Sequence, residues 1–252
     1  MDIFKAYANY YNLLYGDKDY QSEVDYVDSL IKKFSNKNVK HLLDLGCGTG
    51  GHALRFASKG YEVEGVDLSE EMIKIAKANS NGIKSINFQI GDARTFSLGK
   101  KIDAITSLFH VINYMTTNDD LQRMFERVSY HLDQDGLFIF DCWYGPAVLS
   151  LRPEVRFKKI ENDNVRIIRV AEPQVCANEN LIDVNYEIIL IDKKNKTAQT
   201  LKETHRVRYL FKPEIELLFK NNGFEMLYCA EFLSNKTPGF DTWGVCFVAK
   251  KI

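Results

Sequence analysis

The sequence predicts an α/β protein with a mostly parallel sheet that is covered by helices on both faces. Three observations predict this fold. Short apolar runs alternate with helical segments through residues 36–148, and those runs are apolar almost throughout, as in buried parallel strands. A glycine-rich turn joins the first such strand to the first helix. The 252 residues are enough for one large core or for a core with an inserted segment.

Capping residues and apolar spacing define the elements of the first half. Ser69 is the expected N-cap of one helix, and Leu121, Phe125 and Val128 share one face of another. The expected strands cover residues 41–46, 61–67, 86–90, 102–108 and 136–143, and the expected helices cover residues 51–59, 69–79 and 117–132.

The pattern changes after the fifth strand. From about residue 156 to 209, apolar and polar residues alternate, which is typical of antiparallel strands with one solvated face. The chain then returns to the strand and helix pattern of its first half. We expect a helix over 213–222, with Gly223 as its C′ residue, and strands over 225–232 and 244–250. We therefore expect an N-terminal helical lid (1–35), a core (36–148 and 212–252) and an antiparallel β insert (149–211) on the substrate side.

Composition excludes several classes of protein. Lys and Arg (33) nearly balance Asp and Glu (34), so bulk charge does not predict a nucleic-acid partner. No apolar run reaches the ~20 residues that span a membrane, and the N-terminus does not resemble a signal peptide, so we expect a cytoplasmic protein without a membrane partner. The five cysteines form no Cys-x-x-Cys pair, so neither a metal site nor a disulfide framework is predicted.

The segment DLGCGTGG, residues 44–51, is the strongest functional signal. A strand ends in a tight glycine turn that opens a helix, so the backbone can approach a ligand closely. Asp67 ends the next strand, twenty-one residues after Gly46, where a carboxylate can accept the hydroxyls of a ribose. Asp92 ends the third strand at the same edge. Asp44 would repel a pyrophosphate but attract a cationic sulfonium or amino-acid tail.

Four segments, DLGCGTGGHA, VEGVDLSEEMIKIAK, INFQIGDAR and IDAITSLFHVINYM, resemble the successive motifs of class I S-adenosylmethionine-dependent methyltransferases, in family order. The resemblance implies the Rossmann-like sheet of that class, with an antiparallel last strand, and S-adenosyl-L-methionine as cofactor. It implies cofactor contacts from Asp44, Gly46, Cys47 and Gly48 (methionine tail), Asp67 (ribose), Met72 (adenine face), Asp92 and Ala93 (adenine edge), Leu108 (floor) and also Leu68. Met72 also fits a helix-core role.

The N-terminal segment YANYYNLLYGDKDYQSE is rich in tyrosine. Packing of an aromatic helix face explains some of these residues, but five phenols in fourteen residues exceed that need. The segment resembles that of nucleotide-linked amino-sugar N,N-dimethyltransferases. The resemblance implies that Tyr11 reaches the substrate and Tyr20 the cofactor, although Asn12 stands where that group has Asp.

Other parts of the chain resemble the same group. FDCWYGPA matches its aromatic pair after the fifth strand, which implies substrate contacts from Trp143 and Tyr144. The sequence departs from the group at two positions. Tyr114 stands where the group has a His near the transferred methyl, and Cys142 replaces a Pro.

The acceptor determines which catalytic groups are needed. A neutral amine attacks an activated methyl without a strong base, and Tyr11 and Tyr114 could position it. A hydroxyl would need a base, for which His110, Asp141 and His205 are candidates, although each also has a structural explanation. Arg206 could hold a diphosphate, or be a solvated strand charge.

The leading hypothesis is N-methylation of a small molecule, a nucleotide-linked amino sugar, by a monomer or homodimer. An O- or N-methyltransferase of another small metabolite is the first alternative. An NAD-dependent oxidoreductase is disfavoured by Asp44 and by the lack of a Tyr-x-x-x-Lys pair, and a non-catalytic cofactor-binding module stays open. An RNA or protein methyltransferase is disfavoured because no basic stripe or Asn-Pro-Pro-Tyr-type motif is present.

Overall fold

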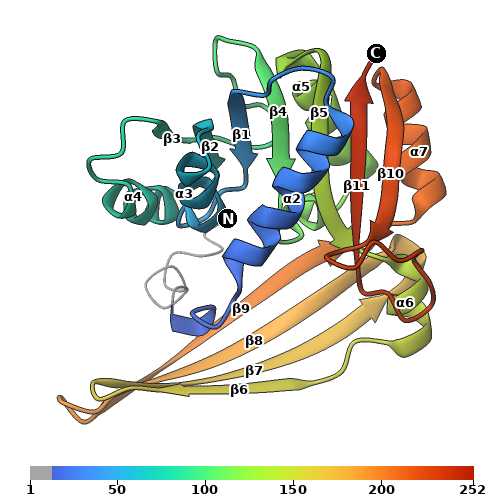
Figure 1. Ribbon diagram of the computed structural model, residues 1–252. Helices are drawn as coiled ribbons and strands as arrows, with labels where there is room; N and C mark the ends of the chain where they lie inside the picture. The colour runs from blue at the N-terminus through green and yellow to red at the C-terminus, as the bar shows by residue number, and fades with distance from the viewer. Residues whose placement is uncertain (1–12) are drawn as a thin grey trace.

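The central sheet is mostly parallel, as the apolar strands predict. The computed structural model describes residues 13–252. The seven strands have the order β10-β11-β5-β4-β1-β2-β3, with β11 antiparallel to both of its neighbours (Figure 1). They are β1 (His41–Leu45), β2 (Glu62–Asp67), β3 (Ile86–Ile90), β4 (Ile102–Ser107), β5 (Leu132–Trp143), β10 (Phe224–Glu231) and β11 (Gly244–Lys251). The carboxyl ends of β1 to β5 therefore meet at one edge, which is the ligand edge of such sheets.

Helices pack on both faces of this sheet, and local capping sets where two of them start. Ser69 accepts a hydrogen bond from the backbone of Met72, and Thr117 accepts one from that of Asp120, so both helices begin where the sequence predicts. The helices are α2 (Tyr20–Phe34), α3 (Gly51–Ser58), α4 (Glu70–Asn79), α5 (Asn118–His131), α6 (Gly145–Leu151) and α7 (Lys212–Asn221), with the 3-10 turns η1 (Val111–Tyr114) and η2 (Ala177–Glu179). The sequence patterns did not predict α6.

Two apolar clusters lie on opposite faces of the sheet. On one face, α2, α3 and α4 contribute residues such as Val27, Phe56 and Ile73. On the other, Phe125 of α5 and Phe219 of α7 pack against the aromatic side chains of β5 and β11. Figure 1 shows α2 lying across the front of the sheet. Both faces are thus buried, which is why the strands are apolar throughout.

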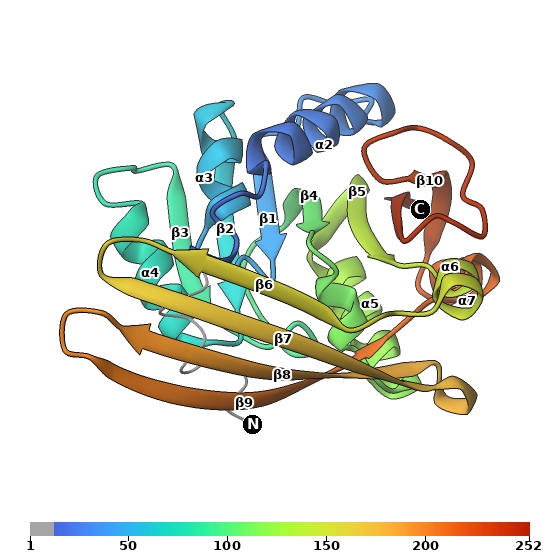
Figure 2. The same ribbon diagram turned by 90° about the horizontal axis from the view of Figure 1, so that it is seen from below.

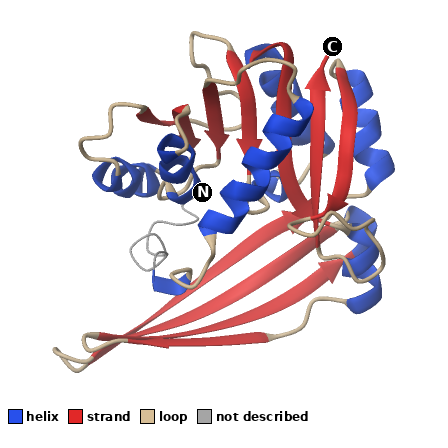
Figure 3. Cartoon of the chain, viewed as in Figure 1, coloured by secondary structure: helices blue, strands red, loops and turns tan. Residues whose placement is uncertain are grey.

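A second, four-stranded antiparallel sheet lies between β5 and α7 in the sequence. Its order is β6-β7-β8-β9, formed by β6 (Arg156–Glu161), β7 (Val165–Cys176), β8 (Leu181–Asp192) and β9 (Thr197–Arg208). Figure 2, viewed from below, shows it running across the carboxyl edge of the central sheet, and Figure 3 shows how far its strands extend past the helices. The second sheet therefore covers the edge where a ligand is expected.

The inserted sheet leaves and rejoins the core at one point. The backbone N–H of Leu210 donates to the carbonyl of Trp143 at 2.9 Å, and that of Gly145 donates to the carbonyl of Leu210 at 2.8 Å.

Across residues 13–252, no helix has the length and apolar character needed to cross a membrane.

Candidate active site

The turn after β1 is built so that only glycine fits at its first position. Gly46 has φ +82°, and a Cβ there would lie 2.5 Å from the methyl groups of Val111. Its N–H and that of Cys47 donate to the carbonyl of Val66 at 2.7 and 3.0 Å. Gly48 has φ +53°, with no atom within 4 Å of its Cβ position. The turn is therefore fixed underneath by β2 and η1 and open above Gly48.

Two carboxylates flank this turn. Asp67 accepts hydrogen bonds from the backbone N–H of Gly48 at 2.8 Å and of Ser69 at 2.9 Å, and burial nevertheless raises its pKa. Asp44 is 1 % exposed, and burial, with Asp67 nearby, raises its pKa to about 6. Its Oδ2 has no hydrogen-bond partner within the described residues 13–252. A buried anionic acceptor beside an open glycine turn suits a ligand that carries a positive charge.

Tyr20 closes one side of the turn from the first residue of α2. A Cβ on Gly51 would lie 2.6 Å from the Tyr20 ring, so the glycine lets the ring approach the start of α3. A cavity of about 260 Å³ lies here, lined by Tyr15, Gly16, Lys18, Tyr20, Thr49, Gly51, Leu54, Arg55 and Asn79. The sequence-predicted contact residue Tyr20 thus lies directly beside the glycine turn.

The other predicted cofactor residues follow β2, β3 and β4. Asp92 is held by Arg94, whose hydrogen bond lowers the carboxyl pKa more than burial raises it. Met72 and Leu108 are nearly fully buried, whereas Leu68 is 64 % exposed. Ala93 packs against the α5 side of the core, and Cys47 belongs to the cluster on the α2 side. Burial of Leu108 and Met72 agrees equally with a core role, so their ligand contacts stay predictions.

His110 and Asp141 form a close pair at the carboxyl ends of β4 and β5. Nδ1 of His110 lies 2.7 Å from Oδ2 of Asp141, and Phe109 and His110 both have left-handed backbone angles. Burial raises the pKa of Asp141, but attraction and hydrogen bonding from His110 outweigh it, and the net pKa is lowered. Consecutive left-handed aromatic residues are costly, and such strain concentrates at functional sites.

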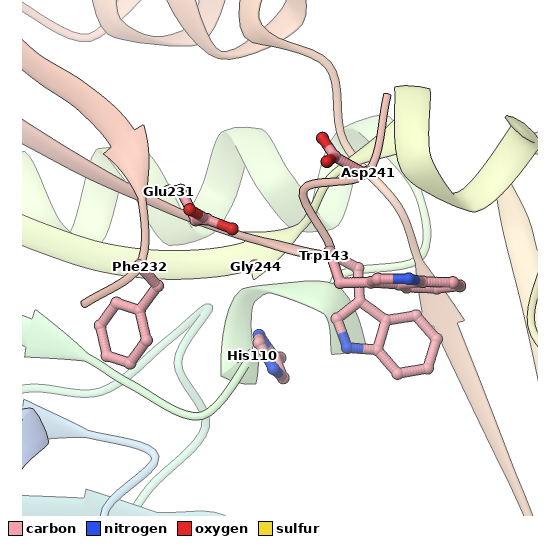
Figure 4. A pocket seen from close by; sticks show the side chains of 7 residues that line it. His110, Trp143, Glu231, Phe232, Asp241 and Gly244 are labelled. Atoms are coloured by element: carbon pink, nitrogen blue, oxygen red, sulfur yellow. The ribbon is translucent and has the colours of Figure 1, made fainter. Parts of the chain in front are cut away.

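A cavity of about 350 Å³ opens beside this pair. Figure 4 shows His110 and Trp143 pointing into it, with the carboxylates of Glu231 and Asp241 above. It is lined by His110, Trp143, Glu231, Phe232, Asp241, Trp243 and Gly244. The indoles of Trp143 and Trp243 meet edge to face, with centroids 6.2 Å apart. The cavity combines aromatic walls with two carboxylates.

Tyr114 lies where η1 meets the inserted sheet. Its hydroxyl is 2.8 Å from Nδ1 of His205 on β9, and Nε2 of His205 is 3.2 Å from a carboxylate oxygen of Glu203. Tyr186 of β8 packs edge to face on His205 at 4.9 Å. This contact joins two segments that lie 91 residues apart in the sequence.

Comparisons with known proteins identify the chemistry of this edge. The family model described as "Methyltransferase domain" matches residues 42–136, which hold the glycine turn and both flanking carboxylates. A solved S-adenosylmethionine-dependent methyltransferase from Clostridium acetobutylicum ATCC 824 is 26 % identical, with a TM-score of 0.83 and 98 % of each chain covered. The chain is an S-adenosylmethionine-dependent methyltransferase. Its cofactor is S-adenosylmethionine.

Two curated relatives cover most of this methyltransferase. A putative methyltransferase of Bacillus subtilis (strain 168), YqeM, is 25 % identical over 99 % of this chain and 97 % of its own length. The dTDP-3-amino-3,6-dideoxy-alpha-D-glucopyranose N,N-dimethyltransferase of Streptomyces fradiae is 28 % identical over 87 % of this chain and 84 % of its own length. The predicted family and fold class are confirmed.

Two predicted substrate residues of the methyltransferase direct their side chains away from the cavities described above. Arg206 points to the outer face of β9 and pairs with Asp183 at 2.6 Å, while its neighbour His205 faces inward. Tyr144 packs against the core on the α5 side. Tyr11 lies outside the described residues, so its predicted role stays a prediction.

Sequence reasoning missed several residues that line the site. Trp243 precedes the last strand, and because that strand is antiparallel, its first residues share an edge with the last residues of β5. Recognising this geometry would have placed Trp243 beside Trp143. Glu231 and Asp241 lie on the two sides of the β10–β11 connection, and no local motif marks them.

Proposed function

We propose that this methyltransferase transfers a methyl group to the amine of a small molecule, specifically a nucleotide-linked amino sugar. The relatives that act on such sugars support the substrate class: three are named dTDP-amino-sugar N,N-dimethyltransferases and are 25–34 % identical. The observation that carries the proposal is the cavity walled by Trp143 and Trp243 and bordered by Glu231 and Asp241. Aromatic faces and carboxylates favour an amine-bearing ligand.

The donor side of the proposal uses the turn after β1. Asp44 would accept a hydrogen bond from the ammonium of the methionine tail, because its buried Oδ2 has a free acceptor site within the described chain. Asp67 would bind the ribose, and the open space above Gly48 would admit the tail. The further proposed contacts are Cys47, Leu68, Met72, Asp92, Ala93, Leu108 and Tyr20. When bound, the cofactor supplies a methyl group on a sulfonium.

The acceptor side of the proposal uses the inserted sheet and the N-terminal segment. Residues 149–211 would cover the acceptor, and residues 1–35 would close over the donor. The electrostatics of the large cavity oppose a phosphate there, because Glu231 and Asp241 are both acidic. The diphosphate of a sugar nucleotide would therefore lie toward the inserted sheet, where Arg169 and Lys158 lie near Tyr15.

Mass spectrometry of reactions with a panel of nucleotide-linked sugars tests this proposal. The panel pairs each amino sugar with its hydroxy analogue, and S-adenosylmethionine is the donor. We expect methylated product from the amino forms only, at one or two methyl groups per molecule. No product from any amino form, with S-adenosylhomocysteine still binding, would discard the substrate class while leaving the cofactor in place.

A matched pair of variants tests the cavity itself. Asp241→Asn removes a carboxylate from the cavity, and we expect a raised KM for the amine with little change in kcat. Phe240→Ala alters the preceding side chain, which is 77 % exposed and does not line the cavity, and we expect it to behave as the wild type. Equal effects from both substitutions would argue against amine binding at this place.

O-methylation is the second candidate, and the His110–Asp141 pair favours it. An imidazole held by a buried carboxylate can accept the proton of a hydroxyl. Product from the hydroxy forms of the panel, lost in His110→Gln, would assign this role instead.

A further inference from the structure

Three buried or partly buried side chains of different chemistry form a hydrogen-bonded chain from η1 into β9. Tyr114 begins it, four residues after His110 and on the same turn as Val111, whose methyl groups lie below the glycine turn. His205 is 4 % exposed in the middle, and the carboxylate of Glu203 ends it. The order is a phenol, an imidazole and a carboxylate.

Within residues 13–252, the contacts of His205 with Glu203 and Tyr114 indicate where its protons lie. A carboxylate only accepts, so the contact with Glu203 requires a proton on Nε2 of His205. Nδ1 of a neutral His205 then carries a lone pair, and Tyr114 must donate to it across 2.8 Å. This is the tautomer in which an imidazole can receive a second proton.

The surroundings keep both groups in these protonation states near pH 7. Burial lowers the pKa of His205, Arg169 lowers it further, and Glu203 opposes them without reversing the direction. Burial raises the pKa of Tyr114 well above its ordinary value, as do Tyr186, Tyr15, Asp67 and Glu203. His205 is therefore neutral and Tyr114 protonated. Within residues 13–252, the titratable or charged groups that act on this pair include Tyr15, Asp67 on β2, Arg169 on β7, Tyr186 on β8 and Glu203 on β9.

We propose that Tyr114 and His205, with Glu203 behind them, form a proton relay that removes the proton from the methylated amine. This inference rests on the proposed function, since it requires an amine acceptor. Tyr114 packs against the same apolar cluster as Trp143 and Trp243, the aromatic walls of the cavity proposed for the amine. From there Tyr114 would touch the reacting nitrogen, and His205 and Glu203 are positioning residues that act through it. Neither His205 nor Glu203 would contact the cofactor.

The lone pair of the amine forms the new N–C bond, the S–C bond breaks, and its electron pair stays on sulfur, which becomes neutral. The resulting ammonium gives a proton to the oxygen of Tyr114 while the phenolic proton of Tyr114 passes to Nδ1 of His205. The imidazolium is stabilised by Glu203 until product leaves and the proton returns to solvent. An amine with its lone pair restored can accept another methyl group.

The relay makes a prediction that needs no acceptor. In ¹⁵N-edited NMR spectra of the whole protein, His205, assigned by its absence in His205→Gln, should show a protonated Nε2 and an unprotonated Nδ1 at pH 7.5. Tyr114→Phe should shift the Nδ1 resonance. A protonated Nδ1 at this pH would overturn the relay whether or not any amino sugar is methylated.

Steady-state kinetics with dTDP-3-amino-3,6-dideoxy-D-glucose as the acceptor are the second test of the relay. We expect His205→Ala to lower kcat about 10²-fold with the KM for S-adenosylmethionine unchanged, and added imidazole to restore part of kcat. Thr204→Ala, on the outer face of the same strand, should match the wild type. Unchanged kcat in His205→Ala, or a loss that imidazole does not rescue in a folded variant, would overturn the relay. Failure of the wild type to methylate this amine would count against the substrate, and the NMR result would then decide the relay alone.

Discussion

Nδ1 of His110 lies 2.7 Å from Oδ2 of Asp141, and the backbone N–H of His110 donates to the other oxygen of the same carboxylate at 3.2 Å. Asp141 is 1 % exposed, and His110 has a left-handed backbone with φ +61°. One carboxylate on β5 thus holds both the main chain and the ring of the residue that lines the large cavity. The loop after β4 owes its shape to a neighbouring strand.

Replacing Asp141 with Asn should loosen this loop. We expect Asp141→Asn to lower the free energy of unfolding by about 1–3 kcal/mol, because it removes the carboxylate that pairs with the ring of His110. His110 lowers the pKa of Asp141 in the folded state, so this stabilisation is present above the unfolded pKa of about 4 and is lost as pH falls through the folded pKa. Urea unfolding at several pH values measures it. Asp135→Asn is the control. Asp135 is exposed, its φ of +61° is also accessible to Asn, and the substitution should change the free energy of unfolding little.

Gly46 and Gly82 offer a matched pair for the glycine turn. Both have left-handed backbones, φ +82° and +83°, but only at Gly46 does a Cβ meet other atoms, the methyl groups of Val111 at 2.5 Å. Gly82→Ala should therefore cost about 1 kcal/mol from backbone strain alone. Gly46→Ala should cost more and weaken binding of S-adenosylhomocysteine, measured by calorimetry. Equal losses of stability and unchanged binding in Gly46→Ala would show that the turn tolerates a side chain.

The ionised carboxylate of Asp44 should destabilise the folded protein. Burial raises its pKa to about 6, so the folded state holds the proton more tightly than the unfolded state, and the penalty is greatest above pH 6 and fades as pH falls toward 4. We expect Asp44→Asn to stabilise the protein at pH 8 by up to about 3 kcal/mol. The same change should weaken S-adenosylmethionine binding at least tenfold.

Calorimetry and thermal unfolding at pH 8 and pH 5 check both effects of Asp44→Asn. Asp119→Asn, an exposed carboxylate in the first turn of α5, is the control. A variant that is stabilised yet binds the cofactor normally would remove Asp44 from the binding site and leave its burial without a function.

His131 should contribute to acid sensitivity. It is 1 % exposed, its Nε2 accepts from the backbone N–H of Leu98, and its Nδ1–H donates to the carbonyl of Arg127. Burial lowers its pKa, so the unfolded state takes up a proton first as pH falls below 6.5, and stability falls with it. The loss attributable to His131 should grow as pH falls below the unfolded pKa of about 6.5.

Unfolding of His131→Gln at pH 7.5 and pH 5 measures the contribution of His131 to the pH dependence of stability. The variant should be less stable at pH 7.5 but lose less on acidification than the wild type. His41→Gln, at a ring that is 40 % exposed, is the comparison variant, and its stability at each pH is set against that of His131→Gln. An unchanged pH dependence in His131→Gln would assign the acid sensitivity to other groups.

The parallel sheet and the glycine turn were predictable because their signals are local. Each strand is a short apolar run, and Gly46 and Asp67 lie at the ends of consecutive strands, so a spacing in sequence becomes a position at one edge. Helix α6 was missed because Gly145 and Pro146 end the strand pattern, and the seven-residue helix is too short to show a clear period.

The contacts between the inserted sheet and the core could not be predicted in this way. Tyr114 and His205 meet only because the inserted sheet folds back across the carboxyl edge, and no periodicity in either segment encodes that path. Neighbouring residues of a strand, such as His205 and Arg206, face opposite sides, but the alternation does not say which side faces the core. Packing of the whole insert decides that.

The hydrogen bonds that join Leu210 to Trp143 and Gly145 have a consequence for how this enzyme can diversify. The chain of the inserted segment joins the core only where its two ends lie side by side. Its length and surface can therefore change by insertion, deletion or recombination without a change in the central sheet. Under the proposed function the insert contacts the acceptor, so a change in the insert can change the acceptor while the binding site of the methyl donor is kept. Exchange of residues 146–209 between relatives is the natural unit for redirecting this chemistry.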